Sequence, residues 1–278
     1  MTEPSALSSP APSSSEASSQ RPRSRRRRIM ILAILAVFLL PLAVRAALHA
    51  AGAAPKSWRD ADWSSIGSLP PAAAHPDARV LVLSGQTGGW KGVVAVHSWI
   101  VVKEQGAKSW SRFDVVGWGN PVRLNGWAPD GRWYGNPPIV IADVSGDAAQ
   151  ALIPRIREAV RTYQWANAGD YRVWPGPNSN TFVASVLRAV PELGVALPAN
   201  AIGRDFRPGP YVGTSDSGTG LEASAFGVIG VKAGWVEGVE LNLLGLVAGL
   251  DLRRPALKLP GWDRIGLDPL PDAVAAGR

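Results

Sequence analysis

The hydrophobic pattern separates one continuous apolar segment near the N-terminus from a longer region of short apolar runs and turns. Residues 29–44 carry no charge, and the segment extends to residue 51 if the Arg45 side chain reaches back to the membrane surface. A helix needs about 20 residues to cross a bilayer. The pattern therefore predicts a transmembrane helix over residues 29–51. A cleaved signal peptide is the alternative, because small residues follow the apolar run at a spacing suited to cleavage.

Positive charge is concentrated on the N-terminal side of this segment. Six arginines and two acidic residues precede residue 29, so four of the seven net positive charges lie there. The positive-inside rule places such a flank in the cytoplasm. We expect residues 1–28 to be a disordered basic cytoplasmic tail, and the protein to be a single-pass protein of the bacterial inner membrane. The residues after the helix would then be periplasmic, and because the charge belongs to the tail, it does not indicate nucleic-acid binding.

After a predicted tether over residues 52–78, the apolar spacing becomes that of β-strands. The turn at residues 105–108 joins two of these strands into a hairpin. Residues 120–138 form a connection rich in glycine, proline and tryptophan, whose length indicates either a functional loop or an element hidden in it. Trp118, Trp127, Trp133 and Tyr134 lie in or next to it and form a second candidate site, an aromatic groove for glycan or lipid acyl chains, with local packing as the alternative. The expected strands are residues 80–83, 93–103, 111–118 and 139–144.

Two helices and a second β region follow. Apolar residues recur at helical spacing over residues 147–163, and a second helix begins after residue 177. Apolar and polar positions alternate over residues 236–243, which predicts that residues 205–265 are a β-rich, antiparallel extension of the same globular unit. The alternative is a packed helix pair, with the glycines at residues 227, 230, 234 and 238 at the contact. Residues 266–278 are expected to be a tail.

Three residues form a candidate catalytic group. Hairpin pairing places Trp99 opposite Asp114, so His97 and Asp114 share one face as diagonal neighbours, and the carboxylate could orient the imidazole. Ser179 lies where the second helix begins, and backbone amides at that end favour developing negative charge. The structural alternative is that residue 178 or 179 caps the helix, His97 is a core histidine and Asp114 is a surface charge.

The sequence from residue 175 to residue 183, Pro-Gly-Pro-Asn-Ser-Asn-Thr-Phe-Val, resembles the nucleophile helix of the circularly permuted papain-like proteins, the lecithin retinol acyltransferase-like group. The motif of that family reads Asn-Cys, two variable residues, then Phe-Val. Asn178, Phe182 and Val183 match it, and Ser179 stands in the position of the cysteine. His97 precedes the helix on a strand, as the histidine of the family does.

Residues 79–266 more closely resemble a bacterial family catalogued as a domain of unknown function, DUF3750, for which no activity is known. The segments that carry this resemblance are Gly89-Trp90-Lys91-Gly92, His97-Ser98-Trp99-Ile100, residues 174–182 and residues 236–243.

The papain-like resemblance implies an α+β fold over residues 79–204, in which an antiparallel sheet packs against the nucleophile helix. It also implies a nucleophile at Ser179, a general base at His97 and an orienting group at Asp114. A serine is not ionised as a cysteine thiolate can be, so its proton must be removed during attack. The expected substrate-binding residues are Asn178, Trp118 and Trp174.

The composition excludes several kinds of catalytic and metal-binding site. The chain has no cysteine, which excludes disulfides, thiol catalysis and cysteine-bound zinc. It has no phosphate-binding loop or nucleotide fingerprint, and we expect neither a cofactor nor a metal. Two hypotheses follow: a membrane-anchored envelope hydrolase or acyltransferase acting on an amide or ester of a lipid or peptidoglycan-type substrate, or a non-catalytic envelope protein with a degenerate papain-like site that serves binding or structure.

Overall fold

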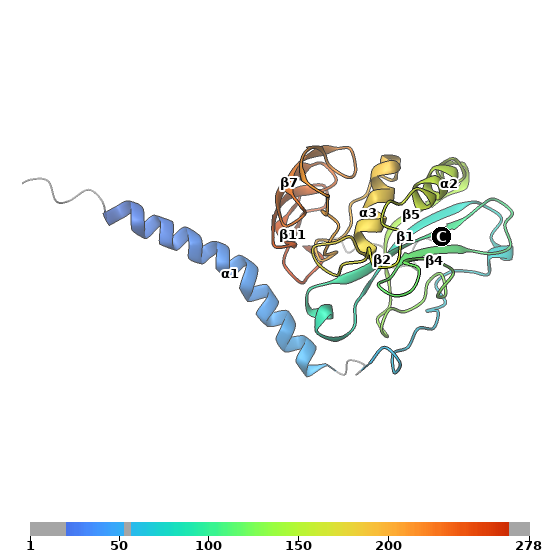
Figure 1. The fold of residues 1–278 in the computed structure, drawn as a ribbon, viewed down its shortest axis with the longest axis horizontal. Coiled ribbons are helices and arrows are strands. Elements are labelled where there is room, and N and C mark those ends of the chain that lie inside the picture. The colour runs from blue at the N-terminus through green and yellow to red at the C-terminus, as the bar shows by residue number, and fades with distance from the viewer. Residues whose placement is uncertain (1–20, 53–56, 267–278) are drawn as a thin grey trace, which may run out of the picture. The chain divides into compact units, whose positions relative to one another are not determined.

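The computed structural model describes residues 21–52 and 57–266 (Figure 1). The helix α1 (Arg21–Ala51) contains the predicted apolar segment, and its residues 25–51 are long and apolar enough to cross a membrane. Residues 21–28 were expected in a disordered tail but belong to this helix, because arginine is a good helix former and extends a helix that the apolar segment nucleates. The expected tails over residues 1–20 and 267–278 lie outside the described residues.

The first sheet has five antiparallel strands in the order β4-β3-β2-β1-β5. Ile100 pairs with Phe113, which places Trp99 opposite Asp114, so the predicted hairpin register is confirmed. The connection over residues 120–138 does contain a short strand, β4. The strands are β1 (Arg79–Gln86), β2 (Val96–Lys103), β3 (Ser111–Val115), β4 (Val122–Leu124) and β5 (Ile139–Ser145).

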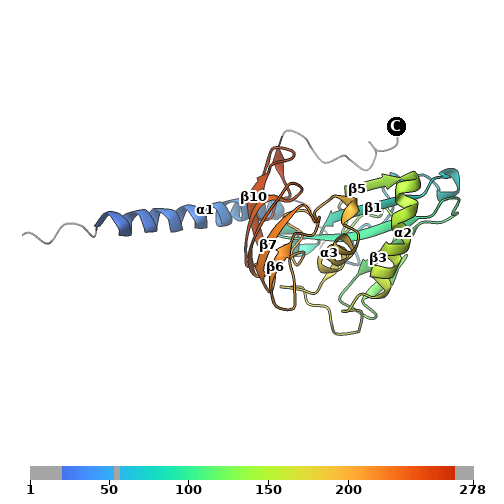
Figure 2. The same cartoon turned by 90° about the horizontal axis from the view of Figure 1, so that it is seen from above.

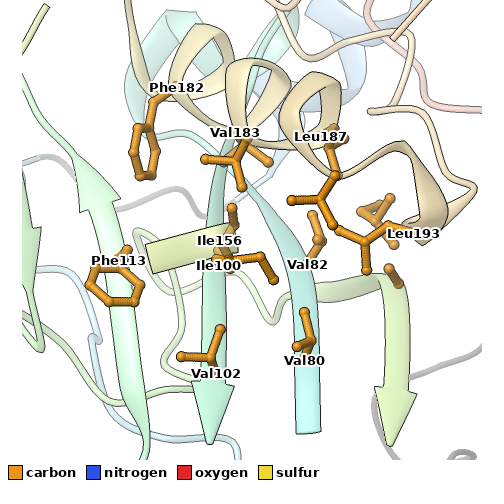
Figure 3. Close-up of a cluster of buried hydrophobic side chains, with 14 of the residues drawn as sticks. Val80, Val82, Ile100, Val102, Phe113, Ile156, Phe182, Val183, Leu187 and Leu193 are labelled. Carbon is orange, nitrogen blue, oxygen red and sulfur yellow. The ribbon is translucent and has the colours of Figure 1, made fainter. Parts of the chain in front are cut away.

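Two helices, α2 (Gly146–Arg161) and α3 (Ser179–Ala189), cover one face of this sheet, close to their predicted positions (Figure 1). Successive residues of a strand point to opposite faces, so alternate residues of β1 and β2 meet the helices. Figure 3 shows Phe182, Val183 and Leu187 of α3 directed at strand side chains, including Ile100. All of these side chains are buried, and each contributes about 1.5–3 kcal/mol by leaving water.

The opposite face of the first sheet is covered by tryptophan-rich loops. Leu81, Leu83 and Trp99 pack there with Trp133, and Trp63 packs against this cluster. The Asp130 carboxylate accepts hydrogen bonds from the backbone amides at residues 68 and 69. A part of the expected tether over residues 52–78 is therefore folded onto the domain, since its tryptophan and backbone amides find partners in these loops.

The second sheet is an antiparallel meander of seven strands, as the sequence predicts, in the order β12-β11-β10-β9-β8-β7-β6. In Figures 1 and 2 it lies beside α3, on the side away from α2. Three short 3-10 helices, η1 (Ala72–Ala74), η2 (Gly89–Val93) and η3 (Pro191–Leu193), occur in connections. The strands are β6 (Pro210–Thr214), β7 (Gly220–Ala225), β8 (Ile229–Gly234), β9 (Gly238–Leu243), β10 (Leu246–Asp251), β11 (Ala256–Lys258) and β12 (Ile265–Gly266).

The second sheet turns its charged face inward. Lys232 is buried and pairs with the carboxylates of Asp205 at 2.7 Å, Asp216 at 3.2 Å and Glu222 at 3.5 Å. Asp216 also pairs with Arg188 of α3 at 3.0 Å. Charged groups thus face the interior of the domain on this side together with the buried Val247, and most of the apolar residues of the same strands lie on the opposite face.

Candidate functional site

A cavity of about 330 Å³ opens at the start of β2, next to the first turn of α3. Residues of both sheets line it, together with loops that carry aromatic side chains. Most of the lining is aliphatic or aromatic, which is typical of a pocket that takes an apolar group and orients it through a few polar atoms. The lining includes His97, Trp118, Trp133, Tyr171, Trp174, Ser179 and Leu244.

The imidazole of His97 is held by a buried carboxylate. His97 Nε2 lies 2.8 Å from Asp114 Oδ1, and both side chains are almost wholly excluded from solvent. Arg112, two residues before Asp114 on the same strand face, donates Nε to Oδ2 at 2.8 Å and Nη2 to Oδ1 at 2.9 Å. The three side chains form a continuous buried chain from guanidinium to carboxylate to imidazole.

This chain sets the charge states of its members. Burial raises the pKa of Asp114, but the Arg112 charge and the hydrogen bonds from His97 and Arg112 outweigh burial and hold that pKa below its usual value. Burial lowers the pKa of His97 below its usual value, even though the Asp114 hydrogen bond and charge act in the opposite direction. The carboxylate is therefore ionised and the imidazole neutral near pH 7. With Nε2 donating to Asp114, Nδ1 carries the lone pair that a base requires.

Two tryptophans fix the orientation of these groups. The His97 ring stacks on Trp133 with centroids 3.6 Å apart and planes inclined by 4°. The Arg112 guanidinium lies 4.0 Å from the centroid of Trp99, and its Nη1 donates to the Ala128 carbonyl at 2.6 Å. The stack on Trp133 thus holds the plane of the imidazole, and the hydrogen bond to Asp114 holds the direction of Nε2.

Ser179 is the first residue of α3, as predicted, and is buried. Asn178 is the N-cap: its Oδ1 accepts from the amides of Asn180 and Thr181, at 2.9 and 3.1 Å. Asn180 Nδ2 in turn donates to the Val96 carbonyl at 2.9 Å, which fixes the helix start beside the strand residue that precedes His97.

The structure joins His97 and Asp114 by a hydrogen bond. Ser179 and His97 both line the cavity. Among the residues that the structure describes, no hydrogen bond joins these two side chains, because His97 lies on the sheet face opposite α3. Ser179 instead lies beside Tyr171. Burial raises the pKa of the Tyr171 hydroxyl, and hydrogen bonding with Ser179 lowers it by less.

The three predicted substrate-binding residues have different environments. Trp118 and Trp174 line the cavity with about half of each side chain exposed, so both are accessible at its mouth. Asn178 also lines it, but its side-chain amide donates to the Val173 and Ile202 carbonyls as well as capping the helix. Its hydrogen-bonding groups are therefore occupied by the fold.

Two residues of the site, Arg112 and Tyr171, were not predicted from the sequence. Arg112 could have been found, because residues two apart on a strand share a face and a buried Asp114 requires a cation. Trp133 and Tyr171 come from loops whose path the sequence does not reveal. Among residues 21–52 and 57–266, no cluster of three or more His, Cys, Asp or Glu side chains is arranged to hold a metal ion.

Neither the curated proteins nor the solved structures contain a protein that matches this chain. Residues 77–206 match the family described as a protein of unknown function (DUF3750). The matched region contains the five-stranded sheet, both helices that cover it, and the site residues His97, Asp114 and Ser179, whereas the second sheet lies beyond it. The similarity to this family covers slightly less than half of the chain, and the description of the family names no activity.

Proposed function

We propose that the protein is a single-pass membrane protein of the bacterial cell envelope, with its N-terminus in the cytoplasm and residues 57–266 on the other side of the inner membrane. Two observations support this topology. Residues 25–51 are long and apolar enough to cross a bilayer, and arginines are concentrated before them. Such a flank is retained in the cytoplasm.

We further propose that the domain is a serine-dependent hydrolase or acyltransferase that acts on an ester or amide. The observation that carries this proposal is an oriented, neutral His97 in the same cavity as Ser179. Maintaining a buried Arg112–Asp114 pair is costly, and buried charged groups that act on the pKa of a neighbouring histidine are concentrated at functional sites. The order of histidine and nucleophile along the chain also agrees with the resemblance to permuted papain-like proteins.

In the proposed reaction, substrate binding brings Ser179 Oγ within hydrogen-bond reach of His97 Nδ1, about 3 Å. Nδ1 takes the hydroxyl proton as Oγ attacks the carbonyl carbon, and Asp114 stabilises the resulting imidazolium. The imidazolium returns the proton to the leaving alcohol or amine, which leaves an acyl group on Ser179. Water, or an acceptor alcohol or amine, then releases the acyl group by the same steps.

The lining of the cavity favours an acyl chain over a purely polar substrate. Val96, Val115 and Leu246 provide aliphatic walls, and the half-exposed rings of Trp118 and Trp174 lie at the mouth. The polar groups of the lining include Lys91, His97 and Ser179. A lipid whose ester or amide lies beside His97 and Ser179, and whose acyl chain lies along the apolar walls, is the substrate class that fits this lining. A peptidoglycan-type substrate would place its more polar chain against the same apolar walls.

One observation favours a second function, ligand binding without catalysis. An acyl-transfer site needs donors for the developing oxyanion. The Asn178 side chain already occupies the amides of Asn180 and Thr181, two of the donors expected at the helix start. A binding protein needs no such donors, and the same cavity could hold an acyl chain unchanged.

Labelling of the full chain with a fluorescent fluorophosphonate distinguishes the two functions, because the reagent reacts with activated serines. Wild type should be labelled, and Ser179→Ala and His97→Gln should not. Ser185→Ala is the matched control: Ser185 lies in the same helix, donates to the Phe182 carbonyl and is not in the cavity wall.

Equal labelling of wild type and Ser179→Ala would reject catalysis at Ser179. In that case, binding of a fluorescent fatty acid, competed by unlabelled acyl lipids and weakened by Trp174→Ala, would support the second function.

A further inference from the structure

The outward face of the second sheet is almost entirely apolar. Its strand register places side chains in rows that cross the sheet. Within the described strands, Thr214 is the one polar residue among these outward positions. The three rows are Val212, Ala223, Val231, Leu241 and Ala248; Thr214, Leu221, Ala233, Val239, Leu250, Leu257 and Ile265; and Pro210, Ala225, Ile229, Leu243 and Leu246.

Many of these side chains are exposed to solvent in large part. Val212 is 86% exposed, Leu221 69% and Val231 53%. Apolar residues extend to the hairpin tips, where Leu244 and Trp235 are 63% and 62% exposed. A contiguous exposed apolar patch of this kind marks an interaction surface.

The sheet is fixed in this orientation by its inner face. Glu222, Lys232 and Glu240 lie opposite one another on neighbouring strands and are all buried. Lys258 pairs with Glu240 at 2.6 Å, and Arg207 pairs with Glu222 at 2.7 Å. A sheet whose polar residues hold buried ion pairs cannot turn its apolar residues inward, because the charges would be left without partners.

The composition of the face points to lipid rather than to another protein. Protein interfaces that form and dissociate are only slightly more than half apolar, and even homodimer interfaces are about 65% apolar.

The residues at the edge of this face and the anchoring of the chain also indicate a lipid surface. Trp235 lies at one hairpin tip, and tryptophan is enriched where proteins meet the membrane–water interface. The exposed Arg253 follows Leu252 at another tip, and cations there are attracted to anionic lipid headgroups. The candidate membrane span ends at Ala51, a few residues before the folded domain. An anchored domain stays close to the bilayer, so the bilayer is the apolar surface with the highest effective concentration around it.

We infer that the outward face of β6–β12 docks on the lipid surface of the membrane that anchors the chain. This inference rests on the proposed anchoring and adds a second contact, made by the folded domain itself. Leu244 belongs both to this face and to the cavity wall. Docking therefore places the mouth of the cavity at the lipid, from which an acyl chain can enter.

The chain has no cysteine, so a single cysteine can carry a fluorophore at a chosen position. The full chain, reconstituted in phosphatidylcholine–phosphatidylglycerol vesicles, is labelled with a polarity-sensitive nitrobenzoxadiazole group at Val231→Cys, in the centre of the face. The matched control is Ala151→Cys, an exposed position on α2. Extraction with alkaline carbonate reports separately whether the helix is integrated.

Lipids with a doxyl quencher near the headgroup should reduce the emission from Val231→Cys by about half, since docked faces lie ~5–10 Å into the interface. They should leave Ala151→Cys unchanged. Equal, weak quenching at both positions in a carbonate-resistant chain would overturn docking and leave anchoring intact. Shielding of Val231→Cys from both doxyl lipid and aqueous iodide would show a protein cover, such as a second copy, and would also overturn it. Quenching at Val231→Cys in a carbonate-extractable chain would support docking and reject the anchor.

Discussion

Replacing Arg112 with methionine tests the buried chain on which the orientation of His97 depends. The variant removes both hydrogen bonds to Asp114, at 2.8 and 2.9 Å, and leaves a carboxylate with no exposed surface and no cation. Removing one partner of a buried ion pair costs about 3–5 kcal/mol. Because both side chains are fully buried, we expect about 4 kcal/mol, and the pKa of Asp114 should rise as the Arg112 charge that lowers it is lost.

Urea unfolding of the full chain in mild detergent, followed by tryptophan fluorescence, measures this loss. With a denaturant slope of about 2–3 kcal/mol/M, the midpoint should fall by about 1.3–2 M. The double variant Arg112→Met/Asp114→Asn supplies the control, since it removes both charges. Its cost should be smaller than the sum of the two single costs by at least ~2 kcal/mol. A loss below about 1 kcal/mol for Arg112→Met, or additive single costs, would refute the assignment of a buried, coupled pair.

Three further changes test other parts of the structure. Asn178→Ala removes the helix cap and should lower stability by about 1–2 kcal/mol, measured by urea unfolding; no loss would contradict its capping role. Lys232→Met leaves three buried carboxylates without their shared cation and should cost about 3–5 kcal/mol, whereas a harmless substitution would contradict the inward charged face. Trp133→Leu opens the stack on His97, so the pKa of His97, followed by NMR, should rise toward its usual value of about 6.5; an unchanged pKa would show that burial by Trp133 is not its cause.

The local parts of the site could be predicted from the sequence because they depend on short-range geometry. A tight turn fixes the hairpin register, and the register alone brings His97 to Asp114. Likewise, the start of α3 follows from a polar cap before an apolar helical run.

The second sheet shows why strand patterns do not reveal which face is buried. The alternation at residues 238–243 correctly predicts β9, yet Glu240 and Asn242 point inward and Val239 outward. Alternation separates two faces without saying which one meets the protein. That choice depends on Arg204, which pairs with Glu240, and on Asp205, which accepts from Asn242 at 2.7 Å. Both lie more than thirty residues away in the sequence.

The relation between Ser179 and His97 also could not be predicted from the sequence. Strand periodicity places His97 on one face of the sheet, and the helix packs on the other. Whether both residues reach a common cavity depends on where the loops with Trp133 and Tyr171 lie. The path of a loop is set by long-range packing, and the sequence of residues 120–138 has no periodic pattern from which this path can be inferred.

The pH dependence of fluorophosphonate labelling at Ser179 tests the central claim most directly, because it reports whether a neutral His97 acts on that serine. The pKa of His97 lies below its usual value, so the imidazole is neutral at pH 7 and gains its proton only in acid. The rate constant should be constant from about pH 7 upward and fall in acid with a midpoint below about pH 6.5, the usual pKa of histidine, and His97→Gln should remain unlabelled throughout this range. A rate constant that does not change in acid, or that rises only at alkaline pH as for an unassisted serine, would contradict the proposed roles of both residues.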